Sequence, residues 1–404
     1  MATGLALRRR HASRVQGQLA SRRRLWLERF PATILLTVQY GAFVVRPAVQ
    51  HHTAPEHLIV GICLVAVLVA FSIEATLVWI GPSRTRPTTV TPQAATIVFF
   101  IGVVATLGTA LSGRGSYAVQ IGTASASRFA SLFTPFVSWL LFGVLLVLYL
   151  YRQRLVSRRR ASMIVFLGFS IETLVSLRQA LFAPLISFAL PVLVGLLLVR
   201  MIRIRWIVIA AFLLPIALPP LYSLRNGLRV QAGGVQGFSG TQTIATRLRL
   251  DLDMGQLRNF AVVPAKIGQP SFGTLVRFGL LPRIFDPQRP NLSTAEQLSV
   301  AIGGSSVSSA SLTPLGEAYV LSSWAGIVGL VALTTLAIAI GVRMQSGWWF
   351  VFLGVAFSGV SALASYPSLL ASALQSIESI CGAMIACWIV RTARSPASRR
   401  LVAA

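Results

Sequence analysis

Residues 158 to 200 read RRRASMIVFLGFSIETLVSLRQALFAPLISFALPVLVGLLLVR. Two apolar runs, at 161–178 and 180–199, follow one another with almost no polar sequence between them, and arginine clusters lie outside both. Each run is close to the ~20 residues that an α-helix needs to cross the hydrocarbon core of a bilayer. The stretch therefore predicts a tight hairpin of two membrane-crossing helices, with Arg178 at its tip.

Apolar runs of this kind recur on both sides of the hairpin. Only 11% of the residues are charged and 55% are hydrophobic, whereas about 25% of the residues of a soluble domain are charged. The chain is therefore predicted to be an all-α polytopic membrane protein with about ten transmembrane helices. The predicted spans are 31–49, 57–80, 94–112, 133–151, 161–178, 180–199, 206–222, 319–342, 347–366 and 371–391.

The placement of the basic residues predicts the orientation. The net charge is +26, and most of the 36 Lys and Arg residues lie at the two ends of the chain and in alternate connections between the apolar runs. Cytoplasmic connections of membrane proteins carry such an excess, so both termini are predicted to be cytoplasmic. Short clusters of this kind favour anionic membrane lipid as a partner and argue against nucleic acid, whose binding proteins gather basic residues on a polar domain.

The same alternation divides the chain into five parts. They are a basic cytoplasmic leader at 1–30, seven spans within 31–222, an extracytoplasmic loop at 223–318, three spans within 319–391 and a basic cytoplasmic tail at 392–404. A loop of that length without secondary structure is uncommon and is usually functional. We expect it to be partly helical, around 243–265 and 292–302.

A charge within a membrane span is costly, and a functional role is the default hypothesis for it. The candidates within the predicted spans are Glu74, Glu172, Arg178 and Glu378. Glu74 lies near the cytoplasmic end of its span and is expected to reach the interface. Glu172 is mid-span and is expected either to neutralise an arginine or to contact substrate, while a structural role is favoured for Glu378. Arg178 is on the outer side, where the charge rule disfavours arginine, which indicates an anionic partner rather than simple snorkelling.

Two arginines open the long loop. Arg225 and Arg229 are four residues apart directly after the seventh span. If this stretch is helical, both side chains lie on one face, near the membrane surface. Arginine pairs of this kind bind phosphate groups well. They are predicted either to hold the head group of a lipid diphosphate or to anchor ordinary lipid head groups.

The loop also contains every carboxylate that is a candidate general base. Glu317 is the first choice, because it stands just before the eighth span and thus close to the membrane plane. Asp251 and Asp253 alternate with Arg247 and Arg249, which is interpreted as a solvated ion-pair network. The remaining candidates are Asp286 and Glu296.

No metal site or cofactor is predicted. The cysteines, Cys63, Cys381 and Cys387, all lie in apolar runs, and no spacing typical of a zinc site occurs.

Two motifs near the end of the loop carry a resemblance to a known family. Residues 278–290 read FGLLPRIFDPQRP, residues 311–319 read SLTPLGEAY, and Gly326 and Gly329 follow. Over roughly 165–345 the chain resembles the bacterial oligosaccharide repeat-unit polymerases, the Wzy-type O-antigen and exopolysaccharide polymerases. It lacks the aromatic cluster that the family carries in its short outer loops.

The resemblance implies a GT-C-like fold in the bacterial cytoplasmic membrane and glycosyl transfer on its outer face. The growing glycan would leave its polyprenyl diphosphate and join a new lipid-linked repeat unit, with a flippase and a chain-length regulator as further partners. The residues predicted to be catalytic are Arg178, Arg225 and Glu317. The residues predicted to bind the diphosphate are Arg178, Arg225, Arg229 and Arg283.

Two other functions remain open from the sequence. A lipid-linked glycan ligase also uses outer arginines but usually adds a loop histidine, and residues 223–318 contain none. A lipid-linked oligosaccharide flippase or other transporter is expected to show two similar halves, which are not visible in this sequence.

Overall fold

The structure is a computed structural model of the chain. It describes residues 29–80, 90–113, 115–120, 124, 125, 127, 129–181, 183–231, 249–259, 312–343, 348, 351, 376 and 378–392. Over these residues the secondary structure is helical and contains no strand. The longer helices are α3 (Pro31–Tyr40), α5 (Glu56–Ile80), α6 (Pro92–Leu111), α9 (Trp139–Arg152), α10 (Arg158–Gln179), α11 (Ala183–Leu198), α12 (Ile204–Gln231) and α18 (Thr313–Arg343).

Five helical segments within the described residues are long and apolar enough to cross a membrane. They are Pro31–His51, Glu56–Ile80, Pro92–Leu111, Thr134–Arg152 and Arg158–Gln179, and they coincide with the first five predicted spans. Shorter apolar helices, Pro184–Leu198 and Ser323–Leu336, stand where the sixth and eighth were predicted. The prediction of a helical membrane protein is confirmed. Most of the ninth predicted span lies outside the described residues.

The first predicted span is helical throughout but changes its winding midway. A π-helical turn, Gly41–Val45, joins α3 to α4 (Arg46–His51). Pro47 is the second residue after this turn. Proline has no N–H to donate to the carbonyl four residues earlier, and its ring crowds that carbonyl, so a wider turn at this point has a clear cause.

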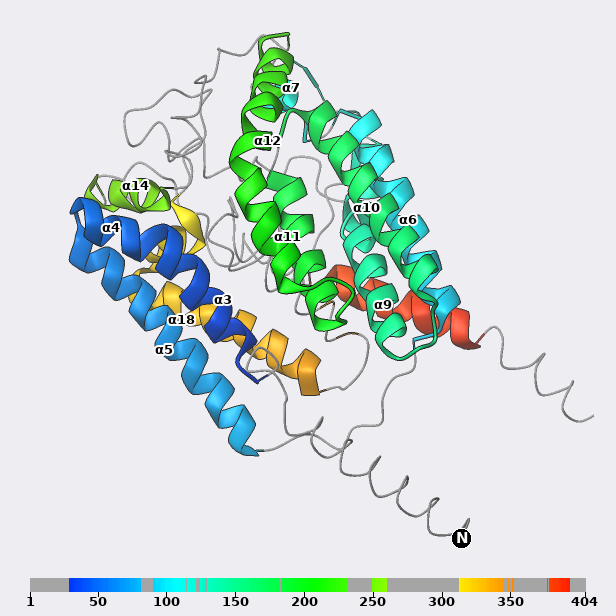
Figure 1. Cartoon of the computed structure of the whole chain (residues 1–404), viewed down its shortest axis with the longest axis horizontal. Helices are drawn as coiled ribbons and strands as arrows, with labels where there is room; N and C mark the ends of the chain where they lie inside the picture. Colours follow the sequence, from blue (N-terminus) through cyan, green and yellow to red (C-terminus); the bar gives the residue numbers. More distant parts are fainter. Residues whose placement is uncertain are drawn as a thin grey trace, which may run out of the picture.

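The helices form two groups (Figure 1). In the first group α3 and α18 both pack along α5, and Trp324 of α18 lies against Gly61 of α5. The short helix α14 (Leu250–Gly255), which comes from the long loop, packs on the end of this group formed by α4 and the start of α18. It falls inside the range 243–265, where helix was predicted.

The second group contains α6, α9, α10 and α11 (Figure 1). Its closest crossing joins α6 and α9 through one glycine on each helix. A methyl group on Gly102 would collide with the backbone of Trp139 and Leu140, and one on Gly143 would collide with the backbone of Phe99. Small residues at helix interfaces allow membrane helices to approach this closely, because lipid supplies little hydrophobic driving force between them.

We expect Gly143→Ala to destabilise the protein by about 1–3 kcal/mol or more, because the two backbones must separate and lose their packing. The matched control is Gly329→Ala on α18, where an added Cβ meets nothing within 4 Å. Thermal unfolding of the purified variants in detergent checks this expectation. Equal melting temperatures for the two variants would show that the crossing tolerates a methyl group.

Helices extend into both ends of the predicted extracytoplasmic segment 223–318. Helix α12 continues through Gln231, and α18 begins at Thr313. Hydropathy marks where the apolar stretch ends, whereas a helix continues as long as its backbone bonds and capping groups support it. Both helix extensions carry residues that the sequence assigns to the candidate site.

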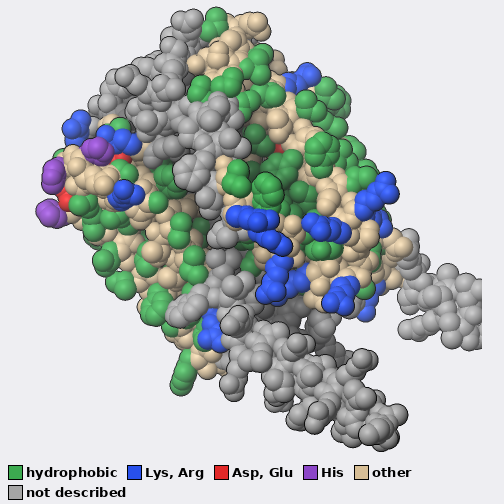
Figure 2. Space-filling model, viewed as in Figure 1, with side chains coloured by type: hydrophobic (Ala, Val, Ile, Leu, Met, Phe, Trp, Pro, Cys, Tyr) green, Lys and Arg blue, Asp and Glu red, His purple; other side chains and the backbone are tan. Residues whose placement is uncertain are grey.

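One end of the second group is strongly basic. The connection from α9 to α10, the connection from α11 to α12 and the helix ends beside them have arginine as their only charged residue type, and all of these arginines are exposed. Figure 2 shows basic side chains gathered together on this part of the surface. These arginines are Arg152, Arg154, Arg158, Arg159, Arg160, Arg200, Arg203 and Arg205.

Candidate functional site

The hairpin between α10 and α11 is as tight as the sequence predicts. Helix α10 ends at Gln179, Ala180 adopts a left-handed conformation with a φ of 54°, and α11 begins at Ala183. The N–H groups of Ala180 and Leu181 donate to the carbonyls of Leu177 and Ser176, which satisfies the last turn of α10. Arg178 is exposed at this tip.

Arg229 of α12 packs against the same hairpin. Its Nε donates a hydrogen bond of 3.1 Å to the carbonyl oxygen of Ala180. Its guanidinium also lies over the ring of Tyr117, with Cζ 4.3 Å from the ring centroid. A planar guanidinium can stack on an aromatic ring and still present its outer N–H groups to an anion. The fold thus places Arg229 against Ala180, which is two residues after Arg178, at the end of the group opposite the exposed arginine cluster.

The stretch from Arg225 to Arg229 is helical, as the prediction of a shared face requires, because it lies within α12. Arg225 is therefore one helical turn from Arg229, on the same side of the helix. Arg283, the fourth residue predicted to bind diphosphate, lies outside the described residues. Tyr117 had no signal in the sequence, since a lone tyrosine in a short connection carries no pattern until Arg229 is placed over it.

Glu317 stands at the start of α18, and the motif around it has a local structural explanation. Thr313 has a φ of 66°, and its hydroxyl accepts from the Gly316 N–H at 3.5 Å. Pro314 follows in the first turn, where proline is favoured. The Leu312 N–H donates to the Glu317 carboxylate. Thr-Pro-x-Gly-Glu is therefore a helix-start sequence in which Thr and Glu both bind free backbone N–H groups.

The Glu317 side chain is nevertheless only partly satisfied. It is 6% exposed, and its Oε1 is buried without a hydrogen-bond partner. Tyr40 of α3 is buried beside Thr313, Leu315 and Glu317. Burial raises the pKa of Glu317 to about 8, and the Leu312 N–H opposes this rise only in part. A carboxyl with a pKa near neutrality is well matched to general-base chemistry.

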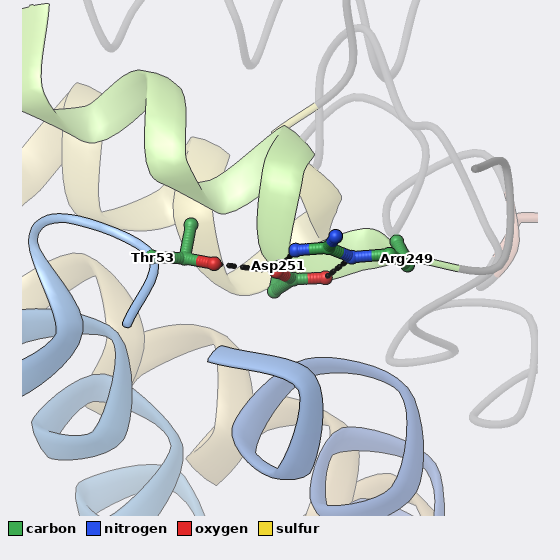
Figure 3. Close-up of polar contacts among 3 residues, drawn as sticks. All are labelled: Thr53, Arg249 and Asp251. Carbon is green, nitrogen blue, oxygen red and sulfur yellow. Dashed lines mark hydrogen bonds and ion pairs between the residues drawn. The ribbon is translucent and has the colours of Figure 1, made fainter. Parts of the chain in front are cut away.

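Asp251 holds α14 in place beside the start of α18. Figure 3 shows its contacts with Thr53 and Arg249. Its carboxylate accepts from the Thr53 hydroxyl at 2.7 Å, and Arg249 Nη2 and Nε lie 2.8 Å and 3.3 Å from its two oxygens. Burial would raise the pKa of Asp251, but the bonds from Arg249 and Thr53 outweigh it and leave that pKa below its usual range. The side chain is completely buried, so the interpretation of a solvated ion-pair network is wrong for Asp251. The ion pair with Arg249 itself is present.

The three carboxylates of the predicted spans differ in their surroundings. Glu74 is buried and accepts from Ala32 N at 2.8 Å, Thr33 N at 3.1 Å and Thr33 Oγ1 at 2.7 Å. It therefore caps the N-terminus of α3 instead of reaching the interface, because the first N–H groups of a helix lack partners within it. Glu378 is exposed, and Glu172 is buried.

The predicted residues thus fall at two places. Arg178, Arg225 and Arg229 lie at one end of α10 and α12, whereas Glu317 lies with Tyr40 in the first group of helices. No hydrogen bond or ion pair within the described ranges connects Glu317 with these arginines. The same residues contain no group of three His, Cys, Asp or Glu side chains that could hold a metal ion.

No family model, curated protein or solved structure matches this chain.

Proposed function

We propose that this chain is a membrane glycosyltransferase that polymerises polyprenyl-diphosphate-linked oligosaccharide repeat units into a surface polysaccharide. The proposal includes the ten-span, GT-C-like arrangement, both termini in the cytoplasm and the long loop on the outer face of the bacterial cytoplasmic membrane. Its partners are the lipid-linked oligosaccharide, membrane lipid, a flippase and a chain-length regulator. It rests on the resemblance carried by residues 278–290 and 311–319 and on the placement of the arginines.

The packing of Arg229 at the Arg178 hairpin is the observation that carries the proposal. Helix α10 separates Arg158–Arg160 at one end from Arg178 at the other, and α12 likewise separates Arg205 from Arg229. About 20 residues of helix span roughly 30 Å, which is the thickness of the hydrocarbon core. The basic cluster accounts for the cytoplasmic bias, so the arginines at the far end call for an anionic ligand at the opposite surface.

A lipid diphosphate fits this position. Its tail remains in the bilayer while its charged head group lies at the membrane surface, where Arg178, Arg225 and Arg229 end. In the proposed reaction, a hydroxyl oxygen of the incoming repeat unit attacks the anomeric carbon of the growing glycan. The bond from that carbon to the diphosphate oxygen breaks, and the arginines stabilise the departing negative charge.

Glu317 is proposed to accept the proton of the attacking hydroxyl. Its unpartnered Oε1 is free to accept a hydrogen bond. A pKa near 8 leaves a fraction of the molecules with this carboxyl ionised at neutral pH. The attacking hydroxyl must come within about 3–3.5 Å of the anomeric carbon that carries the diphosphate. The proposal therefore requires the donor and the acceptor to meet between the two groups of helices, with the arginines on the diphosphate and Glu317 on the hydroxyl.

A deletion strain distinguishes the candidate functions. Loss of a polymerase leaves single repeat units on the final acceptor and removes the ladder of longer glycans on a gel. Loss of a ligase instead leaves polymer attached to its lipid carrier, and loss of a flippase leaves repeat units facing the cytoplasm. We expect the first pattern, with the ladder restored by the intact gene. A full ladder in the deletion strain would exclude the proposal.

A further inference from the structure

Glu172 extends into the interior of the second group of helices. It lies four residues after Gly168 on the buried face of α10, and residues four apart share a helix face. Gly168 is a meeting point of the group, because the side chains of Phe99 (α6), Val144 (α9) and Phe188 (α11) all lie against it. The Glu172 side chain is 8% exposed.

No side chain in the described part of the chain neutralises this carboxyl. It forms no ion pair or hydrogen bond there, and the sequences of α6 and α11 contain no ionisable residue. The ionisable residues of α9, which are Tyr149, Tyr151 and Arg152, lie at its far end, and Arg178 of α10 is exposed. A carboxyl buried without a protein partner is costly, and bound water is a common solution.

Further polar side chains lead from Glu172 toward the Arg229 end of the group. Ser176 is one turn further along α10 and completely buried, and its hydroxyl has no hydrogen-bond partner in the protein. Thr106 Oγ1 on α6 is also buried without a hydrogen-bond partner. Thr106 is seven residues after Phe99 and therefore lies on the same face of α6. Gln179 comes next on α10 and lies against Gly115. We call Thr106, Glu172, Ser176 and Gln179 the polar seam.

We propose that the polar seam binds a short file of water molecules and opens to the aqueous phase beyond the buried Gln179, where its neighbour Arg178 is exposed. Water would supply the missing partners of Ser176 and Thr106, since a buried water makes about three hydrogen bonds. It would also connect the Glu172 carboxyl with the surface where Arg229 packs on Ala180. This hydration is independent of the proposed glycosyl transfer, because it follows from the unpartnered polar atoms of α6 and α10.

Cysteine accessibility in lipid nanodiscs tests the proposal, because both membrane surfaces are then open to the reagent. Starting from a variant without Cys63, Cys381 and Cys387, Ser176→Cys is compared with two controls. Leu174→Cys lies at similar depth but is 65% exposed on the outside of α10, and Val165→Cys is on the buried face further inward.

A thiol reacts with a charged thiosulfonate only as its thiolate, which forms in water and not in lipid or a dry interior. We expect Ser176→Cys to react about tenfold faster than either control. Equal rates for Ser176→Cys and Leu174→Cys would overturn the proposal, since the hydroxyl would then lie in a dry interface.

A second measurement uses the protein without substitutions. A water-soluble carbodiimide and an amine convert a water-accessible carboxyl to an amide, with release of the corresponding urea. We expect peptide mass spectrometry to find Glu172 modified, like the partly exposed Glu56, and Glu74 unmodified, because α3 holds both of its oxygens. Modification of Glu56 without Glu172 would contradict an open seam.

Discussion

Replacement of Arg229 by alanine is expected to reduce polymer formation by about a hundredfold or more. Removal of one group that stabilises developing charge costs about that much in enzymes. Arg229→Ala removes the charge beside the Arg178 hairpin together with the hydrogen bond to Ala180 and the contact with Tyr117. Arg229→Lys keeps the charge but loses the planar guanidinium, so we expect an intermediate loss. Polymer length on gels of surface glycan, in a deletion strain complemented with each variant, checks both expectations.

Arg205→Ala is the matched control for this experiment. Arg205 is on the same helix and also lies over an aromatic ring, that of Trp206, at 5.7 Å, but it belongs to the opposite, basic end of α12. We expect it to leave the glycan ladder unchanged while the protein remains membrane-inserted. Arg178→Ala and Arg225→Ala are expected to abolish polymer in the same assay. A full ladder from both Arg178→Ala and Arg229→Ala would remove the diphosphate site from the proposal.

Glu317→Gln is expected to decrease the polymerisation rate by about a hundredfold or more, which is within the range for loss of a general base. Glutamine has nearly the same shape and keeps an acceptor oxygen for the Leu312 N–H, so the start of α18 is expected to form. The measurement is the rate of polymer formation from lipid-linked repeat units with purified protein. A variant with wild-type rates would show that Glu317 serves only to begin the helix.

The pH dependence gives an independent check on Glu317. A base must be ionised, so the wild-type rate is expected to rise with pH and level off above about 8, the pKa of this carboxyl in the fold. Stability follows the opposite trend, because the folded-state pKa is raised above its ordinary value of 4.5. The contribution of Glu317 to stability is complete below about pH 4.5 and is lost as the pH rises to about 8. Glu317→Gln is expected to lack both trends.

The sequence predicted some parts of the candidate site because they depend only on local pattern. The α10–α11 hairpin was visible as two apolar runs that meet at Arg178, and α12 carries Arg225 and Arg229 on one helical turn. The surroundings of buried charges were not visible in this way. The sequence predicts that Glu74 reaches the membrane interface. In the structure it binds the N–H groups of Ala32 and Thr33, which are about forty residues away along the chain. A single amino-acid sequence contains no signal for such a pairing.

Asp251 shows the same limit from inside the loop. Its alternation with Arg249 predicts the ion pair, but its burial depends on Thr53 from the connection between α4 and α5. An alternating charge pattern is typical of solvated segments. Only the docking of α14 on the first group of helices removes this carboxylate from water.

The sequence alone determined that this is a helical membrane protein and where most of its helices lie, because the bilayer requires long apolar segments whose backbone bonds are satisfied internally. That requirement acts on each segment separately and can be read along the chain. Tertiary structure decided how Gly102 and Gly143 cross, which helix Glu74 caps, and that Arg229 meets the Arg178 hairpin while Glu317 lies in the other group. These contacts join segments distant in sequence, and they depend on side-chain shape and on the pairing of buried polar groups, which hydropathy does not encode.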